Sequence, residues 1–138
     1  MTITHHELCF GCGLANLFGL QLEVEPGGER RVSGRFFVKQ DHQGPPGFAH
    51  GGILATALDE AMALLVHDLE EPALTRRLEV DLLGSVPIGA FASVSAWIES
   101  DEGRRMQLGA DLRGEGDEVL ARARGIFVRV KPVGGETA

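Results

Sequence analysis

The sequence predicts an α+β fold in which a curved antiparallel β-sheet wraps around one long central α-helix. Strand-like runs, in which apolar and polar residues alternate, flank a single helix-like run. That run, residues 53–66, lacks proline and glycine and is apolar in almost every direction of a helical wheel. Such a helix must be buried on all sides, and it is too short to span a membrane. A surrounding sheet satisfies both conditions.

Two strands are expected before the helix. Leu20, Leu22 and Val24 alternate with polar residues, a Pro-Gly-Gly turn follows at residues 26–28, and the alternation resumes over residues 32–38. This pattern is typical of a β-hairpin. The glycine- and proline-rich residues 41–52 then form a loop that leads into the helix.

Four further strands are expected after the helix, near residues 77–82, 93–98, 105–112 and 121–130. Regular alternation indicates one buried and one solvated face, as in an antiparallel sheet. In the last run the apolar parity changes at Gly125, which predicts a β-bulge there. The expected order is therefore strand, strand, helix and four strands.

Length and charge restrict the class of protein. The 138 residues suit one domain, 1–138, with an N-terminal segment at 1–17 and a flexible tail at 132–138. A net charge of −7 without a basic run disfavours nucleic-acid binding. The first residues lack the features of a signal peptide, so we expect a cytoplasmic protein with no membrane association.

The loop before the helix is the first candidate site. Gly51 and Gly52 stand where the helix begins, and glycines allow a ligand to approach the backbone closely. The first N–H groups of a helix lack helical partners and lie at its positive end. They can stabilise a carbonyl oxygen as it becomes an oxyanion. The alternative is that both glycines only form a tight turn.

Asp59 is the second candidate, because it lies two turns into the apolar helix. Burying a carboxylate costs several kcal/mol unless it is paired, so a fold that keeps one uses it as a base, a nucleophile or a hydrogen-bond node. A carboxylate satisfied within the core is the alternative. Glu60 points about 100° away, and we expect it to be more exposed or to face another subunit.

These residues resemble a known family. His50-Gly51-Gly52 with Asp59 nine positions after the histidine resembles the PaaI-like branch of hotdog-fold thioesterases. The opening Cys-Phe-Gly-Cys-Gly and residues 75–89 are similar to THEM4-like relatives. The resemblance implies a hotdog fold and hydrolysis of acyl-CoA thioesters, without a cofactor, since coenzyme A is part of the substrate. It also implies a homodimer or a dimer-of-dimers tetramer with active sites at subunit interfaces.

The resemblance also implies roles for single residues. Asp59 is the nucleophile or, through water, the general base, and Thr75 orients the water or the carboxylate. The amide of Gly52, with that of Gly51, polarises the thioester carbonyl, and His50 supports this loop or contacts the carbonyl. The remaining substrate-binding candidates are Gln43, where better-known relatives carry an asparagine, and Gly47, Phe48, Arg122 and Arg124, the two arginines contacting CoA phosphates.

The sequence also allows three other interpretations. Cys9-x-x-Cys12 invites a zinc site, but a closed site needs four ligands and only His5 and His6 lie nearby, so we predict a plain turn and no metal. A hotdog hydratase is disfavoured because Leu64 stands where an acid–histidine pair would need its histidine. A non-catalytic acyl-CoA-binding protein remains an alternative.

Overall fold

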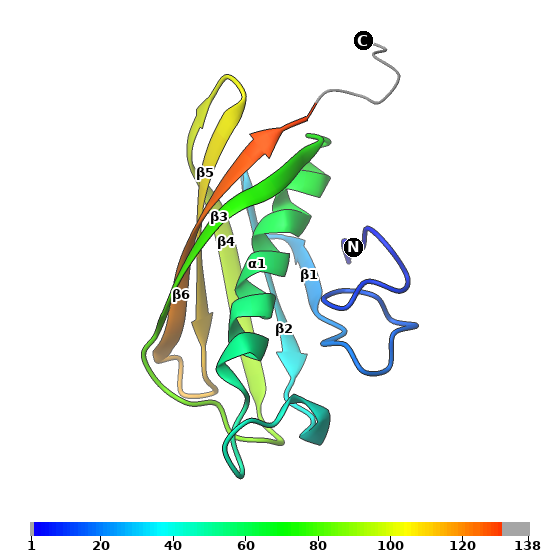
Figure 1. Ribbon diagram of the computed structural model, residues 1–138, viewed down its shortest axis with the longest axis vertical. Helices are drawn as coiled ribbons and strands as arrows, with labels where there is room; N and C mark the ends of the chain where they lie inside the picture. Colours follow the sequence, from blue (N-terminus) through cyan, green and yellow to red (C-terminus); the bar gives the residue numbers. More distant parts are fainter. Residues whose placement is uncertain (1, 131–138) are drawn as a thin grey trace.

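Within the described part of the chain, six antiparallel strands form one sheet, and a single α-helix lies against its concave face (Figure 1). The computed structural model describes residues 2–130, so the predicted flexible tail at 132–138 lies outside the described residues. In chain order the elements are β1 (Glu23–Pro26), β2 (Arg31–Phe37), a 3-10 turn (Gln40–His42), α1 (Gly51–Asp68), β3 (Ala73–Leu82), β4 (Phe91–Glu102), β5 (Arg105–Arg113) and β6 (Val119–Arg129). This order confirms the prediction.

The core lies between α1 and the sheet. The strands are ordered β1-β2-β4-β5-β6-β3, and α1 contacts every one of them. Leu58 and Met62 of α1 are fully buried against Val94, Leu108 and other apolar residues of the strands. Burial of each large side chain contributes about 1.5–3 kcal/mol, so the sheet holds the helix firmly in register.

One stripe of α1 is not covered by the sheet. Gly52, Thr56, Asp59 and Ala63 are partly or fully exposed, and their spacing places them along one side of the helix. The prediction that the helix is buried on all sides is therefore wrong within a single chain. A six-stranded sheet closes around most of the helix but leaves this stripe open beside β3.

The bulge predicted at Gly125 is also wrong. Gly125 and Phe127 both lie on the buried face of β6, while Ile126 between them is half-exposed on the other face. Phe127, which is almost completely buried, keeps the alternation in phase. The irregularity in this pair of strands is on β3, between Thr75 and Arg77.

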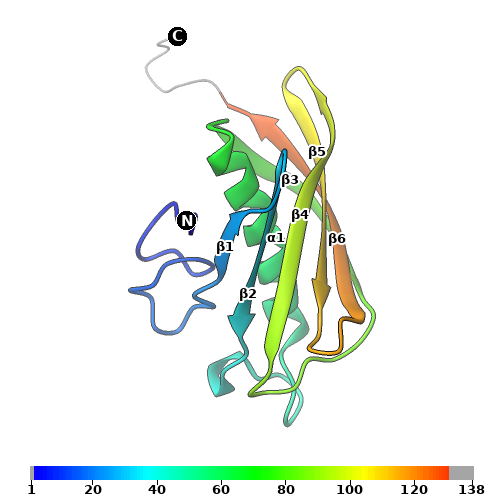
Figure 2. The same cartoon turned by 180° about the vertical axis from the view of Figure 1, so that it is seen from behind.

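The two edges of the sheet differ. β1 is extended by a bridge between Ile3 and Val24, so the N-terminal segment lies beside this edge (Figure 2). β3 forms the other edge, and within residues 2–130 it pairs only with β6. A ten-residue strand with one unpaired side is a ready surface for a further strand.

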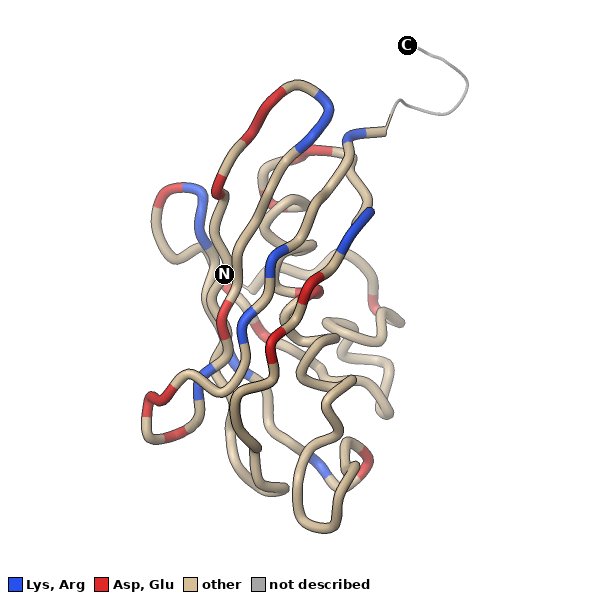
Figure 3. The backbone as a smooth tube through the Cα atoms, turned by 60° about the vertical axis from the view of Figure 1, so that its left-hand side comes forward, with Lys and Arg blue, Asp and Glu red and all other residues tan. Residues whose placement is uncertain are grey.

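Charged residues of both signs are spread along several strands rather than gathered into one basic patch (Figure 3). Among residues 2–130, no helix combines the length and the apolar character that crossing a membrane requires.

Candidate active site

Asp59 and Thr75 form the centre of the candidate site. Thr75 Oγ1 donates a hydrogen bond of 3.0 Å to Asp59 Oδ1. The helix supplies the carboxylate from its open stripe, and β3 supplies the hydroxyl from its helix-facing side, opposite Phe127. The two candidates predicted from sequence are thus in contact, although they lie 16 residues apart.

The environment of Asp59 suits a base. Burial raises the pKa of its carboxyl above the ordinary value of 3.8, and the hydrogen bond from Thr75 opposes this rise. Burial disfavours the charged form, whereas a hydrogen bond to the carboxylate stabilises it. Within residues 2–130 no Lys or Arg forms an ion pair with this carboxylate. Asp59 is therefore half-buried, and no cationic side chain among residues 2–130 is paired with it.

The beginning of α1 is capped by a histidine. His50 adopts φ −66° and ψ 139°, and its Nδ1 accepts a 2.8 Å hydrogen bond from the N–H of Gly52. The His50 carbonyl accepts from Ile53 at 2.9 Å and from Leu54 at 3.3 Å. A neutral ring that accepts at Nδ1 carries its proton on Nε2, so this N–H is available to a ligand.

Among residues 2–130, one first-turn amide of α1, that of Gly51, has no hydrogen-bond partner. The Gly52 amide, which the resemblance assigned to the substrate carbonyl, is occupied by His50. By contrast, the N–H of Gly51 has no acceptor among residues 2–130. The geometry thus favours Gly51, rather than Gly52, as the amide that a carbonyl oxygen can reach.

The loop before α1 is closed by its own hydrogen bonds. Gln43 Oε1 accepts from the N–H of Gly47 at 2.7 Å, and a bridge joins Gln43 to Ala49. Phe48 is paired with Pro87 and keeps 41 % of its surface exposed. Gln43 therefore shapes the loop, while Phe48 offers an apolar surface to a ligand. Their assignment to substrate binding stays a prediction.

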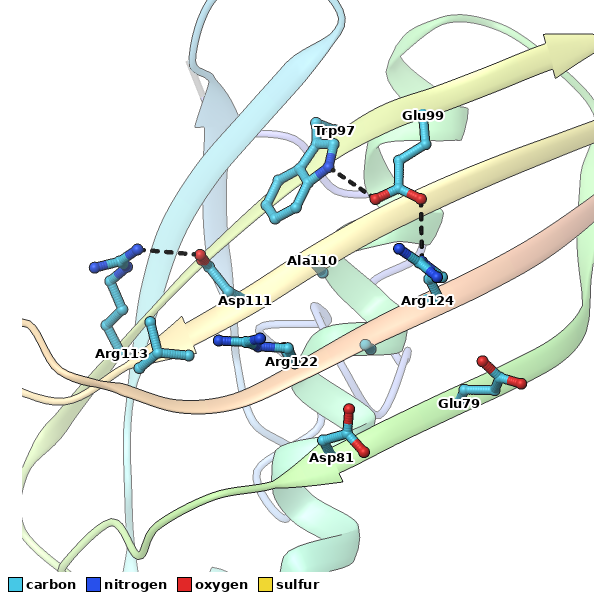
Figure 4. A pocket seen from close by; sticks show the side chains of 11 residues that line it. Glu79, Asp81, Trp97, Glu99, Ala110, Asp111, Arg113, Arg122 and Arg124 are labelled. Atoms are coloured by element: carbon cyan, nitrogen blue, oxygen red, sulfur yellow. Dashed lines mark hydrogen bonds and ion pairs between the residues drawn. The ribbon is translucent and has the colours of Figure 1, made fainter.

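Arg122 and Arg124 lie on the outer face of β6, away from α1. They line a hollow on this face (Figure 4), and Arg124 Nε is 3.3 Å from Glu99 Oε1. The hollow also contains Arg113 and four carboxylates, those of Glu79, Asp81, Glu99 and Asp111. Because acids outnumber arginines there, a single chain does not offer this hollow to phosphates. Within one chain the structure does not bring these two arginines together with Asp59.

A second set of arginines lies farther along the same outer face, where one of them, Arg77, is paired with Glu79 at 2.7 Å. Arg76, Arg77 and Arg105 surround a hollow whose remaining lining, Ile126 and Val128, is apolar. Two of these arginines directly follow Thr75 in β3. The sequence alone does not place Arg105 beside Arg76 and Arg77, because β3 and β5 are separate strands that lie on opposite sides of β6.

The prediction that Glu60 is more exposed than Asp59 is wrong. It is 8 % exposed and contacts His5 and Cys9 of the N-terminal segment. The sequence did indicate that the two acids point in different directions, because neighbouring residues of a helix are about 100° apart around its axis. That direction points toward the N-terminal segment, which packs on the side of α1 away from β3.

The fold and site define a single-helix hotdog protein of the thioesterase type, and comparison with known proteins agrees. The profile of the thioesterase superfamily matches residues 46–121, which is more than half of the chain, so the protein belongs to this family. The matched region includes both the His50 loop and Asp59. The resemblance seen in the sequence is thereby confirmed.

One curated relative shows how far the sequence similarity extends. The chain is 30 % identical over 105 residues to the acyl-coenzyme A thioesterase THEM4 of Xenopus laevis, which covers 75 % of this chain and 47 % of the relative. The chain thus spans about half the length of the curated relatives it matches.

Solved structures agree on the fold. The PaaI protein of E. coli has a TM-score of 0.76 at 17 % identity, covering 80 % of each chain. A Streptococcus pneumoniae thioesterase solved with coenzyme A has a TM-score of 0.75 at 17 % identity, covering 79 % of this chain and 85 % of that one. The predicted hotdog fold is confirmed.

Proposed function

We propose that this protein hydrolyses acyl-CoA thioesters to a free acid and CoA, with Asp59 as the reacting carboxylate. The observation that carries the proposal is the half-buried Asp59, bonded to Thr75 and left open on one stripe of α1. The curated relatives are named acyl-coenzyme A thioesterases, which supports this substrate class. Among the structures of similar fold, two variants of the S. pneumoniae protein replace an aspartate and a threonine, also 16 positions apart.

The chemistry needs few groups because a thioester is already activated. Asp59 either attacks the carbonyl carbon directly or removes a proton from an attacking water. In both cases the C–S bond breaks and CoA leaves as a thiolate. Attack by water gives the carboxylic acid directly, whereas attack by Asp59 gives a mixed anhydride that a water molecule then hydrolyses to the free acid and the Asp59 carboxylate. An N–H group at the carbonyl oxygen stabilises the negative charge that develops there. The N–H of Gly51 and the Nε2–H of His50 are the donors available in this protein.

One chain cannot supply both halves of this site to one thioester. Gly51 and Asp59 are eight residues apart on α1, which is about 12 Å along the helix axis at 1.5 Å per residue. The Gly51 N–H also points out of the N-terminal end, away from Asp59. A base and an oxyanion donor that act on the same carbonyl must each lie within about 3–4 Å of it.

We therefore propose a homodimer in which Asp59 of one chain works with Gly51 and His50 of the other. The unpaired edge of β3 and the open stripe of α1 lie side by side, so a second copy can cover both. Leu78 and Leu82 add exposed apolar surface on the helix-facing side of β3. A two-fold axis at this edge forms two equivalent sites. Further pairing of dimers into a tetramer remains a prediction.

The phosphates of CoA need cations near the interface. Arg76 and Arg77 follow Thr75 directly on β3, and Arg105 completes their hollow. Guanidinium groups bind phosphate oxygens through paired hydrogen bonds. We propose this cluster, which also lies on the outer face, for the phosphates in place of Arg122 and Arg124, because among residues 2–130 the carboxylate paired with it is that of Glu79 alone.

The first test is CoA release from a panel of acyl-CoAs that includes short, medium, long and aromatic acyl groups. Wild type should turn over at least one class, and Asp59→Asn should lose about 100- to 10,000-fold in kcat. Asp68→Asn is the matched control, since Asp68 is an exposed aspartate at the other end of α1.

Two outcomes would replace the proposal. If wild type binds acyl-CoAs but releases no CoA from any, the protein is a binding module. Consumption of enoyl-CoA without release of CoA would instead indicate a hydratase.

A further inference from the structure

The N-terminal segment and α1 bring four metal-binding side chains together on the side of the helix away from β3. His5, Cys9 and Cys12 meet Glu60, and all four ligand atoms lie within 4.8 Å of one another. Glu60 stands 51 residues from Cys9 in the sequence. A search for ligands near the two cysteines in sequence therefore finds only three of the four.

The distances in the cluster suit a tetrahedral ion. His5 Nδ1 is 3.2 Å from Cys12 Sγ and 3.3 Å from Glu60 Oε2, and Cys9 Sγ is 3.4 Å from Glu60 Oε2. Zinc binds sulfur at about 2.3 Å and nitrogen or oxygen at about 2.0 Å, so the edges of its tetrahedron are about 3.3–3.8 Å. These three separations are close to such edges, and the remaining ones, which are within 4.8 Å, need to shorten by at most about 1 Å to hold an ion.

Charge and burial give a second, independent argument. Cys12 is 1 % exposed and Glu60 is 8 % exposed. Within residues 2–130 the ion pair recorded for Glu60 is with His5, and no Lys or Arg is paired with it. A buried acid beside two thiols is unfavourable without a cation, and a divalent ion supplies one.

The surrounding backbone supports a thiolate pair. The N–H of Gly11 donates to Cys9 Sγ at 3.3 Å, and the N–H of Gly13 donates to the Cys9 carbonyl at 2.9 Å. The first bond contacts the Cys9 sulfur, and the second closes the turn that carries both cysteines. A side chain at position 11 would overlap Glu60, so the turn passes directly over the carboxylate. Such N–H···S bonds orient and stabilise metal-bound cysteines.

We propose that His5, Cys9, Cys12 and Glu60 bind one structural Zn²⁺ ion. Two thiolates, an imidazole and a carboxylate are ligands that zinc accepts, and the thiolates disfavour Mg²⁺ and Ca²⁺. All four positions come from the protein, as in structural rather than catalytic zinc sites. Binding releases the two thiol protons to solvent. The ion fastens the N-terminal segment to α1 one residue from Asp59.

The test is the metal content of tag-free protein expressed with zinc and purified under reducing conditions. Wild type should retain about one zinc per chain, and Cys9→Ser and Cys12→Ser should each retain less than about a tenth of that. His6→Ala is the matched control, because His6 neighbours His5 but lies outside the cluster. It should retain zinc as wild type does.

A measurement on wild type alone guards against variants that fail to fold. Reduced, metal-free protein titrated with Co²⁺ should develop the visible bands of tetrahedral cobalt and thiolate-to-cobalt charge transfer, and Zn²⁺ should abolish both. The proposal is overturned if wild type carries no metal and gives no such spectrum, which would leave a hydrogen-bonded thiol cluster. Equal zinc in wild type and in folded cysteine variants would overturn it as well.

Discussion

Replacing Gly51 with proline removes one N–H group and leaves the fold almost unchanged. Gly51 is the first residue of α1, a position that proline favours because its N–H is not needed there. The preceding residue, His50, already has the φ of −66° and ψ of 139° that a following proline requires. The N–H of Gly51 bonds to nothing within residues 2–130, so no internal hydrogen bond is lost.

The magnitude follows from the proposed role of this N–H. Loss of one oxyanion donor lowers kcat by about 100- to 1,000-fold, or about 2.7–4 kcal/mol of transition-state stabilisation. Gly51→Ala is the control, since both variants place a Cβ 2.8 Å from Leu82 Cδ1, a movable side-chain end, but only alanine keeps the N–H. CoA release measures kcat, and thermal unfolding checks that both variants are folded.

The same variant tests the shared site. Gly51→Pro and Asp59→Asn should each be inactive alone, yet unfolding and refolding them together should restore activity. In a random mixture half of the dimers are hybrids, and each hybrid has one intact site, so recovery should be about a quarter of wild type. If each site were instead built from a single chain, every site in a hybrid would carry one of the two substitutions, and activity would not return.

Two results would refute the reasoning. Gly51→Pro with the kcat of Gly51→Ala would remove this amide from the mechanism. Hybrids without activity, in samples shown to have exchanged subunits, would contradict a site shared between chains.

The remaining predictions concern pH and phosphate binding. Because burial raises the Asp59 pKa, the folded state binds a proton more tightly than the unfolded state, so stability falls as pH rises from 3.8 through the folded pKa. Asp59→Asn should therefore be more stable than wild type at neutral pH and lose this advantage below pH 3.8, as thermal unfolding would show. Thr75→Val should raise the Asp59 pKa further and move the rising limb of kcat/KM to higher pH, whereas Thr75→Ser should not. Arg76→Ala should raise KM about tenfold with kcat unchanged. If KM rises in Arg122→Ala instead, the result would support the sequence-based assignment of Arg122 to the CoA phosphates.

Local patterns were enough to predict the order of elements. Alternation along each strand and the continuous apolar run of the helix both survive folding, because each reflects which side chains are buried. The bulge at Gly125 failed because Ile126 and Val128 are apolar but lie on the outer face. A prediction from alternation assumes that apolar residues face the core, and this assumption fails for a sheet with apolar residues on both faces.

The site was predicted in part. Asp59 stood out because a carboxylate in an apolar helix is costly, and the family resemblance supplied Thr75. The choice between the Gly51 and Gly52 amides depends on which one the His50 ring occupies, which is a matter of side-chain orientation. Sequence spacing carries no such information.

By itself, the sequence determined the fold class, the family and the candidate carboxylate, because these depend on periodicity, composition and local spacing. Only the tertiary structure decided which distant groups meet. It placed Glu60 beside Cys9 and Cys12, gathered Arg76, Arg77 and Arg105, and left one stripe of α1 open beside β3. Such meetings depend on strand register and helix rotation, which arise from packing of the whole chain rather than from any local segment.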